Sequence, residues 1–331
     1  MIQSNIDEQG IALITWNLPG RANVLNAGSM AAFAVEVEQA LADAAVVGIV
    51  VASAKDHFIL GGDLKEIAAL PDVATTVKMG REFHRIFRRL ETGGKPVAMA
   101  ITGLALGGGL ELCLAGHYRV ALNSGKVQMG FPEVNLGLLP GAGGTQRFPR
   151  LVGLQAALLP LLTARLMRPA EALKLGLVNE LAETPEAVLD AARAWILGGG
   201  AAVQPWDVRG FTTPGMDMTS AGTTFLYAGT AGMVRQKTGG NYPAANAILD
   251  CLYEGLQMAF DQALEVEIRH FAYVAQSKVA RHMIRSLFFN MNVAKGGGAR
   301  PTGFPGSRVE KLGVLGAGMM GAGIAYVSAK A

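Results

Sequence analysis

Two uninterrupted apolar runs of strand length set the strongest limit on the fold of this chain. Val46–Ala52 has the sequence VVGIVVA, and Pro96–Ile101 has the sequence PVAMAI. A run of this length without polar alternation predicts a strand that is buried on both faces. Between the two runs, Val73–Leu90 places Phe83 and Phe87 on one helical stripe. This alternation of strand and helix predicts an α/β fold with a buried sheet.

Further strands and helices are expected on both sides of this unit. Ile2–Asn5 and Ile11–Trp16 predict a β-hairpin, and Asn26 is a good N-cap for a helix over Ala27–Ala44. The second half of the chain is predicted to be helical, except for a loop rich in glycine, threonine and proline. The remaining strands are expected at Tyr118–Leu122 and Val127–Met129, the loop at Gly198–Gly222, and the helices at Leu151–Leu162, Pro169–Leu175, Thr184–Leu197, Thr223–Gln236, Ala244–Gln276 and Ser277–Met291.

Composition excludes several classes of protein. Half of the 331 residues are apolar and 17% are charged, which is enough for a sizeable core. The net charge of +3 argues against a nucleic-acid-binding stripe but would not repel an anionic small molecule. Cys113 and Cys251 lack the spacing of a metal site or a disulfide framework, which favours a reducing compartment. We expect no secretory signal and no membrane span, and therefore a cytoplasmic location.

The last residues carry a separate pattern. Val309–Leu315 predicts a strand, which is followed by GAGMMG (316–321) and the start of a helix. This is the strand–turn–helix setting of a dinucleotide-binding fingerprint. The chain ends ten residues after this motif, before the acidic ribose ligand that is expected about 20 residues on. We therefore expect an incomplete NAD motif that is non-functional in this chain and gives no measurable NAD binding, formed by Gly316, Gly318 and Gly321.

Two glutamates in apolar surroundings are the candidates for chemistry. Glu111 lies one helical turn after three glycines, Gly107 to Gly109, at a predicted strand-to-helix junction. Such a junction leaves backbone N–H groups free to meet a ligand. Glu133 follows a short strand in the sequence GFPEV. A lone buried glutamate is costly unless it is paired or functional, and from the pattern alone a buried salt bridge or a cap is an equal alternative for Glu111.

Two other glycine-rich segments could belong to the same site. FILGGDLKE (58–66) ends an apolar strand with two glycines, and Asp63 is a plausible N-cap. PGAGGT (140–145) lacks the Gly-Lys-Ser/Thr of a phosphate-binding P-loop, so we interpret it as a loop that lines an acyl pocket. His57 and His84 have no nearby nucleophile, and we interpret them as surface or core histidines.

Taken together, these segments resemble the crotonase superfamily of enoyl-CoA hydratases and isomerases. The resemblance covers residues 1 to about 190, and it depends on four segments, RANVLN (21–26), FILGGDLKE (58–66), GLALGGGLELCLAGHYRVAL (103–122) and MGFPEVNLGLLPGAGGTQRFPRLVG (129–153). One departure is His117, where the family usually has an acidic residue. AGMVRQKTGGNYPAAN (231–246) and GAGMMGAGIAY (316–326) resemble the multifunctional β-oxidation enzymes, in which a hydratase domain precedes 3-hydroxyacyl-CoA dehydrogenase domains.

The resemblance implies a fold, a reaction and a set of residues. The fold would be α/β, with a crotonase-like ββα superhelix core and a C-terminal helical region. The reaction would be the syn addition of water to a 2-enoyl-CoA in fatty-acid β-oxidation, a lyase reaction, with Δ3,Δ2-enoyl-CoA isomerisation as a further activity. Glu111 would face the water, Glu133 would give a proton to Cα, and the amides of Gly62 and Gly108 would bind the thioester oxygen. The implied contacts to substrate or coenzyme A are Arg21, Ala22, Leu60, Gly61, Asp63, Leu64, Gly107, Pro132 and Gly141.

The resemblance also implies how the chain is divided and what it binds. Residues 1–190 would be the hydratase core, 191–293 a helical extension, 294–308 a linker, and 309–331 the truncated start of a dehydrogenase domain. No cofactor is expected beyond the coenzyme A of the substrate, and no metal. The expected partners are an acyl-CoA thioester and, in a full-length enzyme, a thiolase subunit or a dehydrogenase domain. The alternatives are a fragment of an NAD-dependent 3-hydroxyacyl-CoA dehydrogenase and another acyl-CoA reaction of the same superfamily.

Overall fold

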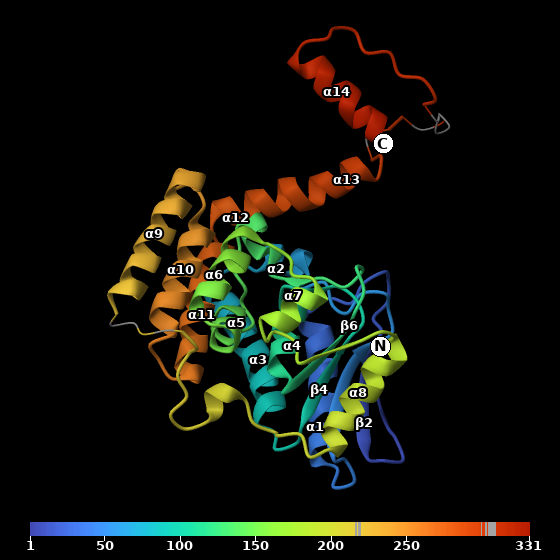
Figure 1. Ribbon diagram of the computed structural model, residues 1–331, viewed down its shortest axis with the longest axis vertical. Helices are drawn as coiled ribbons and strands as arrows, with labels where there is room; N and C mark the ends of the chain where they lie inside the picture. Colours follow the sequence, from blue (N-terminus) through green and yellow to red (C-terminus); the bar gives the residue numbers. More distant parts are fainter. Residues whose placement is uncertain (216, 218–219, 299, 302, 304–308) are drawn as a thin grey trace. The chain divides into compact units, whose positions relative to one another are not determined.

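The computed structural model forms two compact units, Met1–Phe289 and Asn290–Ala331. It describes residues 1–331 apart from 216, 218–219, 299, 302 and 304–308. The first unit contains all the strands of the described residues, and most of the helices (Figure 1).

A six-stranded sheet forms the centre of the first unit. Only its first pair, the predicted hairpin, is antiparallel, and every later pair is parallel. The order is β1 (Ile2–Ile6), β2 (Ile11–Trp16), β3 (Gly48–Ser53), β4 (Val97–Ile101), β6 (Tyr118–Leu122) and β8 (Glu180–Ala182). The two apolar runs became the neighbouring strands β3 and β4, paired through Val50 and Ala98. They occupy the middle of the sheet, as their lack of polar alternation predicted.

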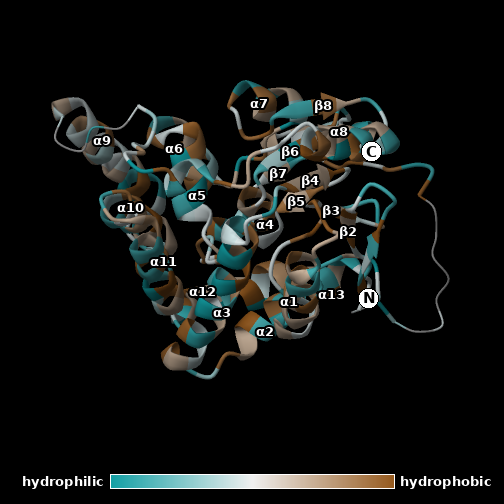
Figure 2. Ribbon diagram, turned by 90° about the horizontal axis from the view of Figure 1, so that it is seen from below, coloured by the Kyte–Doolittle hydropathy of each residue, from teal (hydrophilic) through white to brown (hydrophobic). Residues whose placement is uncertain are grey.

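Helices cover both faces of this sheet (Figure 2). On one face, the side chains of Val50, Ala98 and Val120 pack against α8 (Pro185–Leu197). The alternate residues of the same strands face the main core, together with residues of α1 (Ala27–Ala42) and α3 (Val73–Thr92). Asn26 caps α1 through a reciprocal capping box with Ser29, as the sequence predicted for this position.

A second, smaller layer of strand pairs lies between the main sheet and the helices that follow it. It consists of β5 (Ala105–Leu106) paired with β7 (Met129–Gly130) and of single bridges Leu25–Gly62, Ile59–Ala105 and Met129–Met167. The strand expected at Val127–Met129 is therefore displaced to β7. Helix α2 (Leu64–Ala69) follows the bridge at Gly62, and α4 (Gly108–Ala115) follows β5. A 3-10 helix at Pro132–Leu136 follows β7, and after it come α5 (Gly144–Val152), α6 (Leu154–Thr163) and α7 (Pro169–Lys174).

The C-terminal part of the first unit is helical, and one predicted helix there is wrong. Its elements are a 3-10 turn at Pro205–Asp207, α9 (Ala221–Thr238), α10 (Pro243–Gly255), α11 (Phe260–Ala275), α12 (Lys278–Met283) and a π-helical segment at Ile284–Asn290. The single helix expected over Ala244–Gln276 is instead the pair α10 and α11. The chain turns after Gly255 because Arg150 of α5 donates hydrogen bonds to the carbonyl oxygens of Gly255 and Met258, at 2.8 and 3.2 Å. These bonds satisfy carbonyls that a helix end leaves open.

Helix α11 packs between α10 and α3. Gly80 of α3 makes this close contact possible, because a Cβ at that position would lie 1.7 Å from Cδ1 of Ile268. The packing brings the buried face of α11 next to the start of α5.

The second unit contains α13 (Met291–Lys295) and α14 (Met319–Lys330). Val309–Leu315 forms no strand, which corrects the sequence prediction. A strand needs hydrogen-bonding neighbours, and the described residues provide none here. Within the glycine motif, Gly316 has φ 97° and Gly318 lies at a bend directly before α14. The linker predicted at 294–308 lies partly outside the described residues. Among the described helices, none combines the length and the apolar character needed to cross a membrane.

Candidate active site

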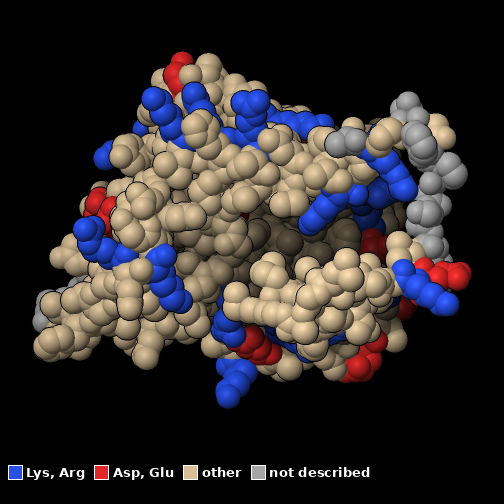
Figure 3. Space-filling view, turned by 90° about the horizontal axis from the view of Figure 1, so that it is seen from above, with Lys and Arg blue, Asp and Glu red and all other residues tan. Residues whose placement is uncertain are grey.

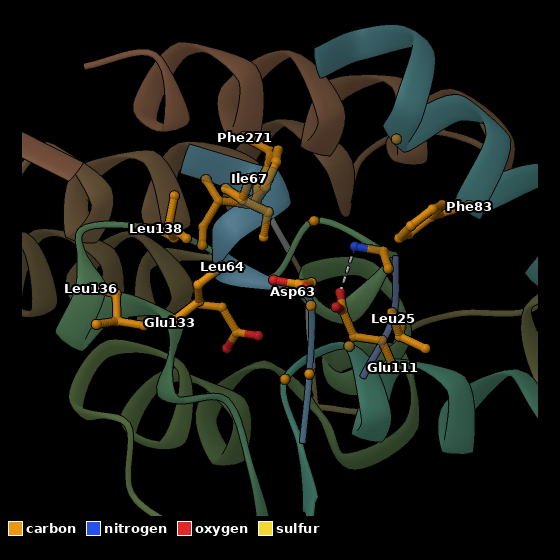
Figure 4. A pocket seen from close by; sticks show the side chains of 18 of the residues that line it. Leu25, Asp63, Leu64, Ile67, Phe83, Glu111, Glu133, Leu136, Leu138 and Phe271 are labelled. Atoms are coloured by element: carbon orange, nitrogen blue, oxygen red, sulfur yellow. Dashed lines mark hydrogen bonds between the residues drawn. The ribbon is translucent and has the colours of Figure 1, made fainter. Parts of the chain in front are cut away.

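The first unit contains a pocket that brings the predicted site residues together. Glu111, Glu133, Gly62 and Gly108 all line it, and Figure 4 shows both carboxyl groups directed toward its middle. Of the predicted contacts, Leu60, Gly61, Asp63, Leu64, Gly107, Pro132 and Gly141 also line it. Arg21, which is exposed, and Ala22, which is half-buried, do not line the pocket. The rest of the wall is mainly apolar, including Leu25, Ile67, Phe83, Leu136, Leu138 and Phe271.

The small layer of strand pairs places two free backbone amides side by side. Leu25 binds the backbone on both sides of Gly62, since its N–H donates to Gly61 O and its carbonyl accepts from Asp63 N–H, both at 2.8 Å. Gly108 is the first residue of α4, so its N–H has no partner within the helix. Within the described residues, neither the Gly62 nor the Gly108 amide donates a hydrogen bond. A Cβ on Gly108 would lie only 3.6 Å from Gly62 N, so both amides border one small space.

Asn23 is a structural residue of this site to which the sequence analysis assigned no role. It is fully buried, and its side-chain amide donates to the carbonyl oxygens of Trp16 and Phe58, at 3.1 and 3.2 Å. Its Oδ1 accepts from Leu18 N–H at 2.9 Å. Asn23 thereby ties the end of β2 to the segment that carries Gly62.

Glu111 lies on α4 with only 2% of its surface exposed. Its Oε1 accepts hydrogen bonds from the N–H groups of Ala142 and Gly144, at 2.8 and 2.6 Å. Gly144 must be a glycine for this approach, because a Cβ there would lie 2.8 Å from the same oxygen. The glycine-rich segment 140–145 therefore binds a carboxylate of the protein, and it lines the pocket through Gly141 and Ala142.

Glu133 approaches the same space from the 3-10 helix and is bound differently. Its Oε2 is enclosed and has no hydrogen-bond partner among the described residues. Its Oε1 lies against the backbone of Gly107, where a Cβ would come within 2.1 Å of it. Gly107 also has φ 52° and ψ −125°, a conformation that favours glycine. This glycine thus serves both the turn into α4 and the approach of Glu133.

Burial and like charge raise the pKa values of both carboxyl groups. For Glu133, burial is the main cause and the charge of Glu267 adds to it, which raises the pKa to about 8. Burial also raises the pKa of Glu111 well above its usual value, followed by the charges of Glu267 and Glu133, whereas the two amide donors lower it. Two amides donate to Glu111, whereas Glu133 has only a hydrogen bond to its own backbone and an Oε2 without a partner among the described residues. These contacts favour one proton on the pair, carried by Glu133.

Glu267 is a third carboxylate at this site, and the sequence analysis missed it. It lies on α11 and is fully buried. Gly143 N–H, Thr145 N–H and the Thr145 hydroxyl donate to it, at 2.5, 2.9 and 2.6 Å. Its position on α11 falls on the apolar stripe formed by Ala263, Leu264, Ile268 and Phe271. That position is the signal that could have identified it, as it did for Glu111.

The histidines lie outside the pocket, and the side chains of His84, His117 and His270 have polar contacts among the described residues. His117 Nδ1 accepts from Val97 N–H at 3.0 Å, and its Nε2 lies 2.9 Å from Glu91 O. Burial lowers the pKa of His117, which favours its neutral form. His84 is buried beside Glu267, and His57 is half-buried. Among the described residues, no group of three or more histidine, cysteine or acidic side chains is arranged to hold a metal ion.

Comparisons with known proteins agree with this geometry. Residues 7–198 match the model of the enoyl-CoA hydratase/isomerase family. The fatty acid oxidation complex subunit alpha of Shewanella baltica (strain OS155) is 39% identical over 97% of this chain. This chain spans only 45% of the length of that relative.

Solved structures give the same fold. An enoyl-CoA hydratase from Bacillus halodurans has a TM-score of 0.63 at 18% identity, over 86% of this chain and 99% of that one. Pseudomonas aeruginosa DspI has a TM-score of 0.55 at 33% identity, over 60% of this chain and 79% of that one.

Proposed function

The chain belongs to the enoyl-CoA hydratase/isomerase family, and on that premise we propose that it adds water to 2-enoyl-CoA thioesters in fatty-acid β-oxidation. One observation carries the proposal. The carboxyl group of Glu111 is held by amide donors, and that of Glu133 has an enclosed Oε2 without a partner; both face a pocket that also contains two backbone N–H groups with no acceptor among the described residues. Hydration needs this combination of groups, since it creates negative charge at one atom and moves two protons.

The amides of Gly62 and Gly108 would bind the thioester oxygen. When water attacks Cβ, electrons move through Cα and the carbonyl group onto this oxygen. Two rigid donors stabilise that charge in the transition state, each worth roughly 3 kcal/mol in comparable oxyanion holes. The N-terminus of α4 adds its positive dipole end at Gly108.

The two glutamates would divide the proton transfers. Ionised Glu111 takes a proton from water as the oxygen bonds to Cβ, and neutral Glu133 gives its proton to Cα. The O–H bonds of water and of Glu133 and the π bond of the enoyl group break, while a C–O bond at Cβ, a C–H bond at Cα and an O–H bond on Glu111 form. Glu133 thus ends ionised and Glu111 ends protonated. Return of that proton through solvent restores the starting state. Opposite protonation states of two neighbouring carboxyl groups are what this reaction requires.

Isomerisation of a 3-enoyl-CoA is proposed as a second activity of the same pocket. It develops the same charge on the thioester oxygen, while one ionised carboxylate takes a proton from Cα and returns it to Cγ as the double bond moves. Glu133 in its ionised form would take this part, because its Oε2 has no hydrogen-bond partner among the described residues.

The substrate class follows from the walls of the pocket and from its surroundings. The apolar residues Leu64, Ile67, Leu136 and Phe271 suit an acyl chain. On the face shown in Figure 3, lysine and arginine side chains form separate groups among uncharged surface, and we propose that groups of this kind bind the phosphates of coenzyme A. We propose that no cofactor beyond this coenzyme is needed. We further propose a cytoplasmic location and assembly with a thiolase subunit or a dehydrogenase domain, since curated relatives are subunits of a fatty acid oxidation complex.

The direct test is purified protein with crotonyl-CoA and with a longer 2-enoyl-CoA, following the loss of the enoyl thioester absorbance. We expect turnover of at least one substrate, and a loss of about 10²–10⁴-fold with Glu133→Gln. A folded protein that leaves both substrates unchanged would contradict the proposal.

A further inference from the structure

Four consecutive backbone amides bind two different carboxylates in alternation. The N–H groups of Ala142 and Gly144 donate to Glu111, at 2.8 and 2.6 Å. Those of Gly143 and Thr145 donate to Glu267, at 2.5 and 2.9 Å. Successive amides in this turn therefore point in opposite directions, toward α4 and toward α11. Rotation of one peptide plane changes φ and ψ at the Cα atoms that it shares with its neighbours, so the bonds that hold one set of amides restrict the other set.

Glu267 is built into this arrangement by further contacts. The Thr145 hydroxyl donates to its Oε2 at 2.6 Å, and His84 Nε2 of α3 lies 3.3 Å from its Oε1. Arg147 Nη1 also holds this turn, since it donates a hydrogen bond to Ala142 O at 2.9 Å. Glu267 does not line the pocket, so it has no direct contact with a substrate there. It also lies outside residues 7–198, the part that matches the family model.

The structure gives Glu267 two ways to act on the site. Mechanically, it holds the turn so that the Ala142 and Gly144 amides stay aimed at Glu111. Electrostatically, its negative charge contributes to the raised pKa of Glu111 and of Glu133. The charged and titratable groups that interact with it from the packed elements are His84 on α3, Arg150 on α5, Cys251 on α10, and the two pocket glutamates. Arg147 on α5 pairs with Glu91 instead.

We propose that Glu267 is a positioning residue for the pocket: from α11 it fixes the turn 142–145, and through that turn it sets the place and the charge state of Glu111. The proposal rests on the proposed hydratase activity. It assigns the C-terminal helices a part in the chemistry as well as in the packing.

The test compares Glu267→Gln with Glu265→Gln in the full chain, using crotonyl-CoA. Glu265 lies on the same helix, but its side chain is 38% exposed and pairs with Arg81 at the surface. We expect Glu267→Gln to lower kcat by roughly 10–100-fold with little change in KM, because it misplaces a reacting group without touching the substrate. Glu265→Gln should behave as the unaltered protein.

The pH profile separates positioning from simple damage to the fold. The acid limb of the rate should follow the ionisation of Glu111, and the alkaline limb should follow the loss of the proton from Glu133. Removal of the Glu267 charge lowers the pKa of both groups, so both limbs should move to lower pH. Equal kcat in the two variants, or a lower kcat with unmoved limbs, would overturn the proposal.

A second pair of variants covers the case in which Glu267→Gln does not fold. Thr145→Val removes the hydroxyl that donates to Glu267 and keeps the shape of the side chain, whereas Thr145→Ser keeps the hydroxyl. We expect a loss of kcat in the valine variant that the serine variant restores, and equal rates in the two would refute the positioning role. Turnover by Glu265→Gln tests the underlying activity separately, since its absence would contradict the proposed function itself.

Discussion

Replacing Glu133 with glutamine should inactivate the pocket and at the same time stabilise the fold. The carboxyl group has an enclosed Oε2 without a partner, and its pKa is raised from 4.5 to about 8. At pH 7 the folded protein therefore keeps a proton that the unfolded chain has released. Folding raises the pKa of this group, so its contribution to stability is fully present below the pKa of the unfolded chain. The contribution is lost as the pH rises toward the pKa of the folded protein.

The size of the effect follows from the same shift. Each pH unit between 4.5 and about 8 costs about 1.4 kcal/mol, so the cost at pH 7 is about 3 kcal/mol. Glutamine has the same shape and does not ionise, so Glu133→Gln removes this cost. The variant should therefore be nearly as stable as the original protein at pH 4.5, and more stable by about 3 kcal/mol at pH 7.

Urea unfolding at a series of pH values, followed by circular dichroism, measures this difference directly. The gain in free energy of unfolding should grow from pH 4.5 to about 8 and then stop growing. Crotonyl-CoA turnover by the same samples should be lost throughout. A stability difference that does not change with pH would refute the reasoning, because it would show that Glu133 does not carry a raised pKa in the folded state.

Three further substitutions test other parts of the site. Glu111→Gln should reduce hydration by about 10²–10⁴-fold and isomerisation of a 3-enoyl-CoA far less, since only hydration uses the water; equal losses in assays with both substrates would end this division of roles. Gly107→Ala should lower kcat about 100-fold, because the new Cβ would lie 2.1 Å from Oε1 of Glu133 and displace that carboxyl group. Gly125→Ala, where a Cβ meets nothing within 4 Å, is the matched control in the same assay. Arg147→Met should lower the free energy of unfolding in urea by about 3 kcal/mol, because it removes the main partner of buried Glu91. Arg88 still pairs with that carboxylate. A decrease below about 1 kcal/mol would contradict this.

The features that the sequence predicted correctly depend on residues close together in the chain. The runs at Val46–Ala52 and Pro96–Ile101 have no polar alternation, which alone predicts burial on both faces, and they form β3 and β4. Asn26 precedes the helix that it caps. The grouping of Glu111 and Glu133 in one pocket was expected from the family resemblance, and the structure brings them together. Their catalytic roles stay predictions until the variants are assayed.

The features that the sequence did not predict depend on contacts between distant residues. The break between α10 and α11 needs Arg150, which is 105 residues away from the Gly255 carbonyl that it binds. Glu267 shares its helix with exposed charges such as Glu265, so its burial becomes evident only once α11 is packed. The strand expected at Val309–Leu315 did not form because a strand depends on neighbours, which a local pattern cannot provide.

The turn 142–145, whose amides bind Glu111 and Glu267 in alternation, also fixes the order in which the site can be completed during synthesis of the chain. The sheet, α4 and the turn itself all precede residue 198, so they leave the ribosome before the C-terminal helices. The bond from Gly143 to Glu267 closes a loop of 124 residues, and it cannot form until α11 has been synthesised and packed. A nascent chain that ends before α11 would thus carry both pocket glutamates while two of the four amides in the turn still lack their carboxylate. The pocket would acquire its final shape at a late step, after most of its walls are already in place.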